Sequence, residues 1–170
     1  MERKAIESLI LWKNSEDRKP LIVKGARQVG KTWLMKEFGR RYYDDTFYFN
    51  FDEEEELASV FQKNKNPERI IDLLGMISGK KIEPGKHLII FDEVQECSDA
   101  LNCLKYFYEN APQYQIVAAG SLLGVALHHG TSFPVGKVDF MDLYPLSFKE
   151  FLCAVGKENL ATLLSAPLAI

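Results

Sequence analysis

The octapeptide Gly25-Ala-Arg-Gln-Val-Gly-Lys-Thr32 is the stretch that decides the fold of this 170-residue chain. It fits the pattern GxxxxGK[ST], in which glycines let the backbone bend so that successive N–H groups point at one anion. A match of this kind arises by chance in about one of two hundred chains of this length. We therefore expect a strand over residues 20–24, a phosphate-binding loop over 25–32 and a helix over 31–41. A glycine turn with an exposed lysine is the alternative.

Individual residues of this loop have separate expected roles. Lys31 places a positive charge within reach of the β and γ phosphates of a nucleotide, and the Thr32 hydroxyl is the expected protein ligand of Mg²⁺. Arg27 and Gln28 occupy variable positions of the pattern, where contact with nucleotide or a neighbour and simple exposure to solvent are equally expected. The expected nucleotide-binding residues are Gly25, Ala26, Arg27, Gln28, Val29, Gly30, Lys31, Thr32 and Trp33.

Two adjacent carboxylates, Asp92 and Glu93, end a second apolar run, 61 positions after Lys31. Because the carboxyl ends of parallel strands meet at one edge of a sheet, we expect this pair to face the phosphate loop. Asp92 would reach the magnesium shell, and Glu93 would orient or deprotonate the water that attacks the γ phosphate. An apolar run ending in Asp-Glu is a weak signal by itself, and the upstream loop is what makes it informative.

Apolar runs and helical patterns alternate along the rest of the chain. Further strands are expected over residues 46–51, 87–91, 114–119 and 136–143. Helices are expected over residues 2–13, from Asp52 with Glu55 as a capping box, and from Pro67 to Met76. Further helices are expected up to Asn110, with Ser98 or Asp99 as the cap, and after the cap residue Ser147. Strands that are apolar throughout and alternate with helices predict an α/β fold, a parallel sheet covered on both faces. Residues 1–19 are the expected N-terminal helix and linker, and 20–170 the expected core.

Ser121 directly follows the apolar run that ends at Ala119 and Gly120. Its hydroxyl is therefore expected at the same sheet edge as Asp92, where a polar group can sense the γ phosphate. A plain helix cap is the competing interpretation of this serine.

Composition excludes several classes of protein. The net charge of −3 gives no general attraction to nucleic acid or to an anionic membrane. Three cysteines without CxxC spacing predict neither a disulfide framework nor a zinc site. With no signal peptide and no apolar run near the roughly 18 residues that span a bilayer, we expect a cytoplasmic protein. The apolar end of the chain, residues 158–170, predicts a fragment of a longer protein.

The chain resembles the bacterial and archaeal AAA-type ATPases that carry an uncharacterised, nuclease-like C-terminal domain. The matching segments are GARQVGKT at 25–32, FDEVQ at 91–95, AAGSLLG at 118–124 and LYPLSFKEF at 143–151. With the N-terminal helix, the resemblance covers nearly the whole chain. It implies an AAA-like P-loop core with five strands in the order 5-1-4-3-2, ATP and Mg²⁺ as ligands, Ser121 as the sensor, and a further C-terminal domain.

The sequence departs from this family at Gly136-Lys137, where the family tends to have Gly-Arg, and no arginine follows Arg69. An arginine finger for a neighbouring subunit therefore cannot come from the region after the acidic pair. Lys137 is a weaker substitute because an ammonium cannot bind phosphate through two parallel hydrogen bonds.

The expected function is Mg²⁺-dependent ATP hydrolysis, slow in isolation and coupled to a homo-oligomer or protein partner. A nucleotide-dependent switch or scaffold without significant turnover is the alternative. A P-loop kinase is a lesser alternative, since the second half of the chain lacks the arginines of a kinase lid.

Overall fold

The computed structural model describes residues 3–54, 56–120 and 136–164. Its sheet has five parallel strands in the order β2-β3-β4-β1-β5. The strands are β1 (Leu21–Lys24), β2 (Asp45–Asn50), β3 (His87–Asp92), β4 (Gln115–Gly120) and β5 (Asp139–Asp142). Read from the other edge, this is the order 5-1-4-3-2, so the predicted α/β fold with a five-stranded parallel sheet is confirmed.

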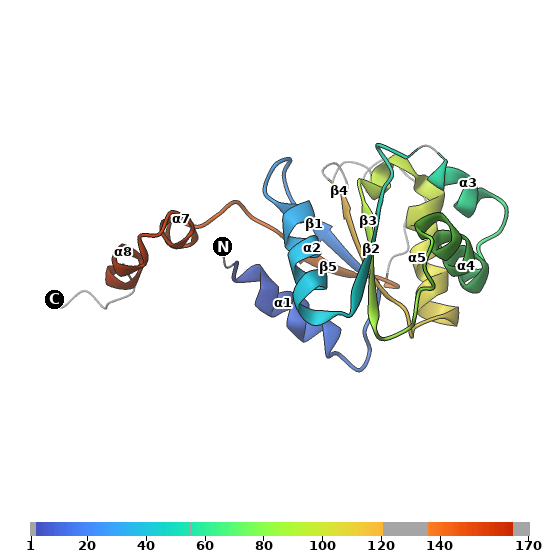
Figure 1. The fold of residues 1–170 in the computed structure, drawn as a ribbon, viewed down its shortest axis with the longest axis horizontal. Helices are drawn as coiled ribbons and strands as arrows, with labels where there is room; N and C mark the ends of the chain where they lie inside the picture. The colour runs from blue at the N-terminus through green and yellow to red at the C-terminus, as the bar shows by residue number, and fades with distance from the viewer. Residues whose placement is uncertain (1–2, 55, 121–135, 165–170) are drawn as a thin grey trace.

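Helices cover both faces of the sheet (Figure 1). One face packs against α1 (Ala5–Lys13) and α2 (Lys31–Tyr42). The other packs against α3 (Leu57–Gln62), α4 (Pro67–Ser78) and α5 (Ser98–Asn110). The described part of the chain also contains the 3₁₀ helix η1 (Val94–Glu96), α7 (Phe148–Ala154) and α8 (Glu158–Leu163).

The period-2 geometry of the strands produces these two layers. In β3, Leu88 and Ile90 join the cluster under α1 and α2, whereas Ile89 and Phe91 join the cluster under α3 to α5. Successive side chains of a strand point to opposite faces, so a strand covered on both faces must be apolar at every position. The uninterrupted apolar run that predicted this strand is therefore explained by its burial.

One predicted helix start and one predicted helix cap are wrong. Helix α3 begins at Leu57 rather than at Asp52, because Asn50 organises the preceding turn: its side-chain oxygen accepts from the Asp52 N–H at 3.2 Å. The predicted partner Glu55 lies outside the described residues. Helix α5 has Cys97 as its cap residue, so Ser98 and Asp99 lie in its first turn.

Two other predicted starts are confirmed. Pro67 occupies the first position of α4, and the Asn66 side chain caps that helix by accepting from the Arg69 N–H at 3.2 Å. Ser147 caps α7 in a reciprocal capping box with Glu150. Both caps satisfy backbone donors that have no partner within the helix itself.

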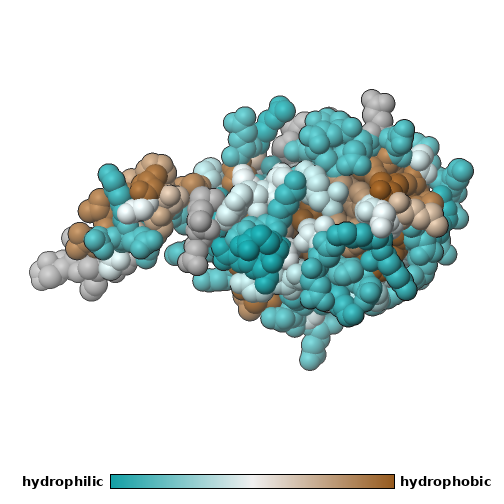
Figure 2. All heavy atoms as spheres, viewed as in Figure 1, coloured by the Kyte–Doolittle hydropathy of each residue, from teal (hydrophilic) through white to brown (hydrophobic). Residues whose placement is uncertain are grey.

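Helices α7 and α8 form an arm that extends away from the sheet (Figure 1). The apolar side chains that the arm exposes are Phe148, Phe151, Val155, Leu160, Leu163 and Leu164. They form a hydrophobic area on the arm in Figure 2. None of the described helices is both long and apolar enough to cross a membrane.

The aromatic cluster around β3 generates a prediction for stability. Phe91 is fully buried, and its ring packs against those of Phe49, Phe51 and Phe61. We expect Phe91→Ala to lower the free energy of unfolding by about 3–5 kcal/mol, since it deletes a buried ring and leaves a cavity. Phe148→Ala deletes a ring that is 65% exposed and should change this free energy by less than about 0.5 kcal/mol. Urea unfolding measures both, and equal losses would contradict the packing described.

Candidate functional site

The phosphate loop joins the carboxyl end of β1 to the first turn of α2. Gly30 adopts the left-handed conformation, with φ 91° and ψ 29°, immediately before α2. A side chain on Gly25 would collide with the Leu143 carbonyl, because the end of β5 lies against the start of the loop. Both fixed glycines of the pattern are therefore required here, one for its backbone conformation and one for the space it leaves.

Lys31 folds back across the loop. Its ammonium group donates to the carbonyl oxygens of Gly25 at 3.0 Å and Ala26 at 2.9 Å, and its side chain is buried. Burial lowers the pKa of Lys31, and the nearby carboxylates of Glu93 and Asp92 oppose that shift. The loop therefore holds one cation close to the acidic pair, on ligands that a phosphate group can replace.

Asp92 ends β3 with its carboxylate nearly inaccessible, at 2% exposed. One oxygen, Oδ2, accepts from the Thr32 hydroxyl at 2.5 Å and from the Tyr48 hydroxyl at 3.0 Å. The other oxygen accepts from the Glu93 N–H at 3.1 Å. The first turn of α2 and the end of β3 are thus joined directly, and the phosphate loop and the acidic pair share one edge of the sheet.

Glu93 leaves the strand in the left-handed conformation, with φ 49° and ψ 42°. Non-glycine residues are uncommon in this region, and those that adopt it are often found at functional sites. Its carboxylate is half-buried and accepts from the Gln95 side-chain amide at 2.7 Å. The turn therefore holds the Glu93 carboxylate beside Asp92 and near Lys31.

The donors at this edge suit Mg²⁺ when a phosphate is present. No group of three or more His, Cys, Asp or Glu residues that could hold a metal exists within the described ranges. The Asp92 carboxylate and the Thr32 hydroxyl supply two adjoining oxygens. Mg²⁺ is usually bound through one or two carboxylates with phosphates and waters completing six ligands, so these residues fit that ion.

The remaining predicted site residues have different positions. Residues 26–28 form the exposed tip of the loop, and Trp33 is 36% exposed on α2. Ser121 lies outside the described residues. Lys137 precedes β5, at the edge of the sheet opposite the phosphate loop, and pairs with Glu109 at 3.1 Å. Within this chain, Lys137 therefore cannot take the place of an arginine beside the phosphates.

Sequence reasoning missed Tyr48 and Gln95, which hold the two carboxylates. The signal for Tyr48 is the alternation along β2, where the apolar neighbours Phe47 and Phe49 face α3 to α5 and Tyr48 faces α2. In the parallel register, Asn50 lies opposite Asp92 and Tyr48 lies opposite Ile90, so Tyr48 is two residues back along the neighbouring strand. Burial beside Asp92 raises the pKa of Tyr48, so this hydroxyl keeps its proton and acts as a donor.

Comparisons with known proteins agree with this architecture. Residues 17–152 match the profile of a family described as AAA domain. No significant match was found among curated proteins. The chain is similar to the structure of the Walker-type ATPase PABY2304 of Pyrococcus abyssi, with TM-score 0.58 and 16% identity over 98% of this chain and 60% of that one. It is also similar to PCH-2 of C. elegans, with TM-score 0.50 and 10% identity over 98% of this chain and 49% of that one.

At these identities the likeness to the two solved structures shows the fold alone. The chain spans 60% of the length of the first protein and 49% of the second.

The Tyr48 contact can be tested without nucleotide. We expect Tyr48→Phe to lower the free energy of unfolding by about 1–3 kcal/mol, because a buried carboxylate oxygen loses a donor. Tyr114→Phe is the matched control, since that hydroxyl donates to Glu68 at 3.3 Å on the exposed surface. It should cost less than about 0.5 kcal/mol. If chemical denaturation shows the two variants to be equally stable, the Tyr48 hydroxyl does not hold Asp92 as described.

Proposed function

The chain belongs to the AAA domain family, and from this premise we propose that it binds ATP with Mg²⁺ and hydrolyses the bond to the γ phosphate. The observation that carries the proposal is the 2.5 Å hydrogen bond between Thr32 and Asp92. It sets the expected phosphate-binding loop against a buried carboxylate that is followed at once by a second carboxylate. Anion-binding donors, a magnesium ligand set and a base for water then occupy one edge of the sheet.

ATP binding is proposed to replace contacts that the loop makes with itself. The ammonium of Lys31 is held by two carbonyl oxygens of the loop, and a phosphate oxygen forms a stronger, charge-assisted hydrogen bond with it. The backbone N–H groups at the start of α2 add the favourable end of the helix dipole. We include Arg27, Gln28, Val29 and Trp33 among the nucleotide contacts of this proposal.

Asp92 and Thr32 are the proposed magnesium ligands, with Tyr48 holding the Asp92 carboxylate in place. Mg²⁺, when bound, neutralises charge on the β and γ phosphates. Glu93 is the proposed base that orients or deprotonates the attacking water, and Gln95 restrains its carboxylate. Ser121 is the proposed sensor of the γ phosphate.

Turnover is proposed to be slow in the isolated chain. Arginines that stabilise the transferring phosphoryl group are a source of large rate gains in such enzymes, and none follows Arg69 in the sequence. A neighbouring copy or a protein partner would have to complete the site. Coupling of ATP hydrolysis to such a partner is part of the proposal.

The binding half of the proposal is tested by Lys31→Ala. We expect the Kd for ATP with Mg²⁺ to rise about ten- to a hundredfold in isothermal calorimetry, since a charge-assisted hydrogen bond worth about 1.5–3 kcal/mol is lost. Lys86→Ala removes the same charge from the exposed opposite end of β3 and should bind ATP like the wild type. Equal affinities of wild type and Lys31→Ala would show that the phosphate site is wrongly placed.

The catalytic half is tested by Glu93→Gln. We expect phosphate release to fall by at least about a hundredfold while ATP affinity is retained, because the amide cannot accept the proton from water. Glu96→Gln changes the same charge three residues later on the exposed side of η1 and should hydrolyse ATP normally. Unchanged phosphate release by Glu93→Gln would instead favour a nucleotide-dependent switch without significant turnover.

A further inference from the structure

Arg3 joins the phosphate loop to the arm formed by α7 and α8. Its side chain is only 4% exposed, and its guanidinium donates to the Val29 carbonyl at 3.2 Å and to the Tyr144 carbonyl at 2.7 Å. The same guanidinium forms an ion pair with Glu150 of α7 at 3.3 Å. One buried cation therefore contacts both the phosphate loop and the segment from Tyr144 to Glu150, which lie far apart in the sequence.

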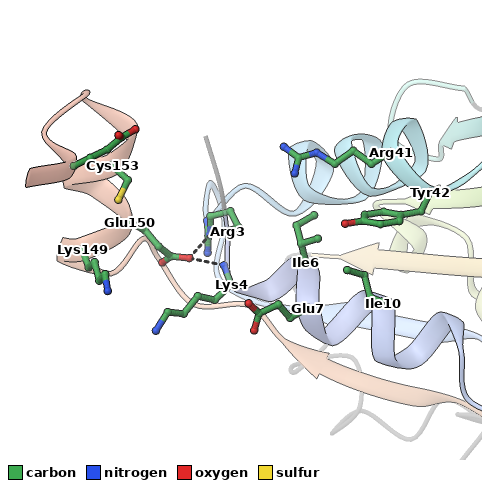
Figure 3. Close-up of a pocket in the computed structure, with 11 residues that line it drawn as sticks. Arg3, Lys4, Ile6, Glu7, Ile10, Arg41, Tyr42, Lys149, Glu150 and Cys153 are labelled. Carbon is green, nitrogen blue, oxygen red and sulfur yellow. Dashed lines mark hydrogen bonds and ion pairs between the residues drawn. The ribbon is translucent and has the colours of Figure 1, made fainter. Parts of the chain in front are cut away.

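Glu150 is the residue through which α7 reaches this cation. Figure 3 shows its carboxylate pointing from α7 toward Arg3 and the backbone of Lys4. Its oxygen Oε1 accepts from the Lys4 N–H at 3.0 Å, and its oxygen Oε2 accepts from the Ser147 N–H at 2.9 Å. Burial opposes ionisation, but these hydrogen bonds and the charge of Arg3 keep the pKa of Glu150 below its usual value.

The contact with Val29 controls the direction of a donor in the phosphate loop. All described peptide bonds are trans, so the N–H of Gly30 points opposite to the Val29 carbonyl with which it shares a peptide plane. Because Arg3 holds that carbonyl, the Gly30 N–H is directed away from Arg3. Rotation of this peptide plane would both break the contact with Arg3 and misdirect the donor.

A cavity separates much of the arm from the rest of the fold. A cavity of about 530 Å³ lies between α7 and α8 on one side and α1 with the end of α2 on the other. Figure 3 shows Ile6, Ile10 and Tyr42 on one side of it and Lys149, Glu150 and Cys153 on the other. At this cavity the arm is joined to the N-terminal segment by the polar contacts of Glu150.

We propose that Arg3 is a positioning residue that couples nucleotide binding at the phosphate loop to the position of the α7–α8 arm. The inference rests on the proposed function, because it requires ATP to bind at the loop. The donors of a planar guanidinium are fixed relative to one another, so a shift of one hydrogen-bond partner moves the others. A single flexible ammonium does not have this property. Coupling between two sites is reciprocal, so breaking the contact between the arm and Arg3 is expected to alter the affinity for ATP.

The closing experiment measures the Kd of the whole chain for ATP with Mg²⁺ in Glu150→Gln. We expect weakening of about fivefold or more, the range typical of coupled sites. The matched control is Glu158→Gln, which removes the same charge from α8 beside the same cavity. Electrostatics alone does not predict weakening, since deleting a negative charge leaves binding of the ATP anion unchanged or tighter. Equal affinities of the two variants would overturn the coupling.

A second readout separates positioning from general stability. We expect ATP to slow amide hydrogen exchange in residues 147–155 of the wild type, and Arg3→Lys to lose this response while still unfolding cooperatively. A wild type that binds ATP without any change in this segment, or an Arg3→Lys variant that keeps the response, would overturn the coupling alone. A wild type that does not bind ATP would overturn the proposed function and the coupling with it.

Discussion

The hydrogen bond from Thr32 to Asp92 depends on the order of the strands, and the candidate site depends on that bond. Strand β4 lies between β1 and β3, so the two residues must approach each other across the end of a strand that carries neither of them. Neighbouring strands are about 4.8 Å apart, which puts β1 and β3 about 10 Å from each other. Strand β4 ends in the small, buried residues Ala118, Ala119 and Gly120, and α2 contacts this strand. The small residues at the end of β4 thereby lie next to the contact between α2 and the end of β3.

Local patterns predicted the strands and the loop because the signals for them lie within a few residues. The apolar run of β3 indicates a buried strand, and the GxxxxGK[ST] pattern indicates a tightly bent loop. The strand order came from the resemblance to a family, since no local signal states which strands are neighbours. Helix starts failed where a residue outside the helix organised the chain, as Asn50 does ahead of α3. Tyr48 and Arg3 were missed because their hydrogen-bond partners are at least 26 residues away along the chain.

Charged side chains are buried at this sheet edge at a cost in stability. Arg3, Lys31 and Asp92 are at most 6% exposed, and each is matched by hydrogen bonds or an opposite charge. Burial of a charge is strongly unfavourable unless it is paired, and removing one partner leaves the other uncompensated. Apolar residues would fill the same volume more favourably. The concentration of buried charge around the loop is thus an arrangement that packing alone does not explain.

The backbone conformation of Glu93 sets a limit on how far this domain can be made resistant to heat. The left-handed region costs a residue with a side chain about 1–2 kcal/mol, and glycine avoids most of that cost. One way to raise the thermal stability of a protein is to replace a residue strained in this way by glycine. At position 93 that route would remove the carboxylate that follows the end of β3. Selection for thermal stability and selection for the base proposed at Glu93 therefore act on this position in opposite directions.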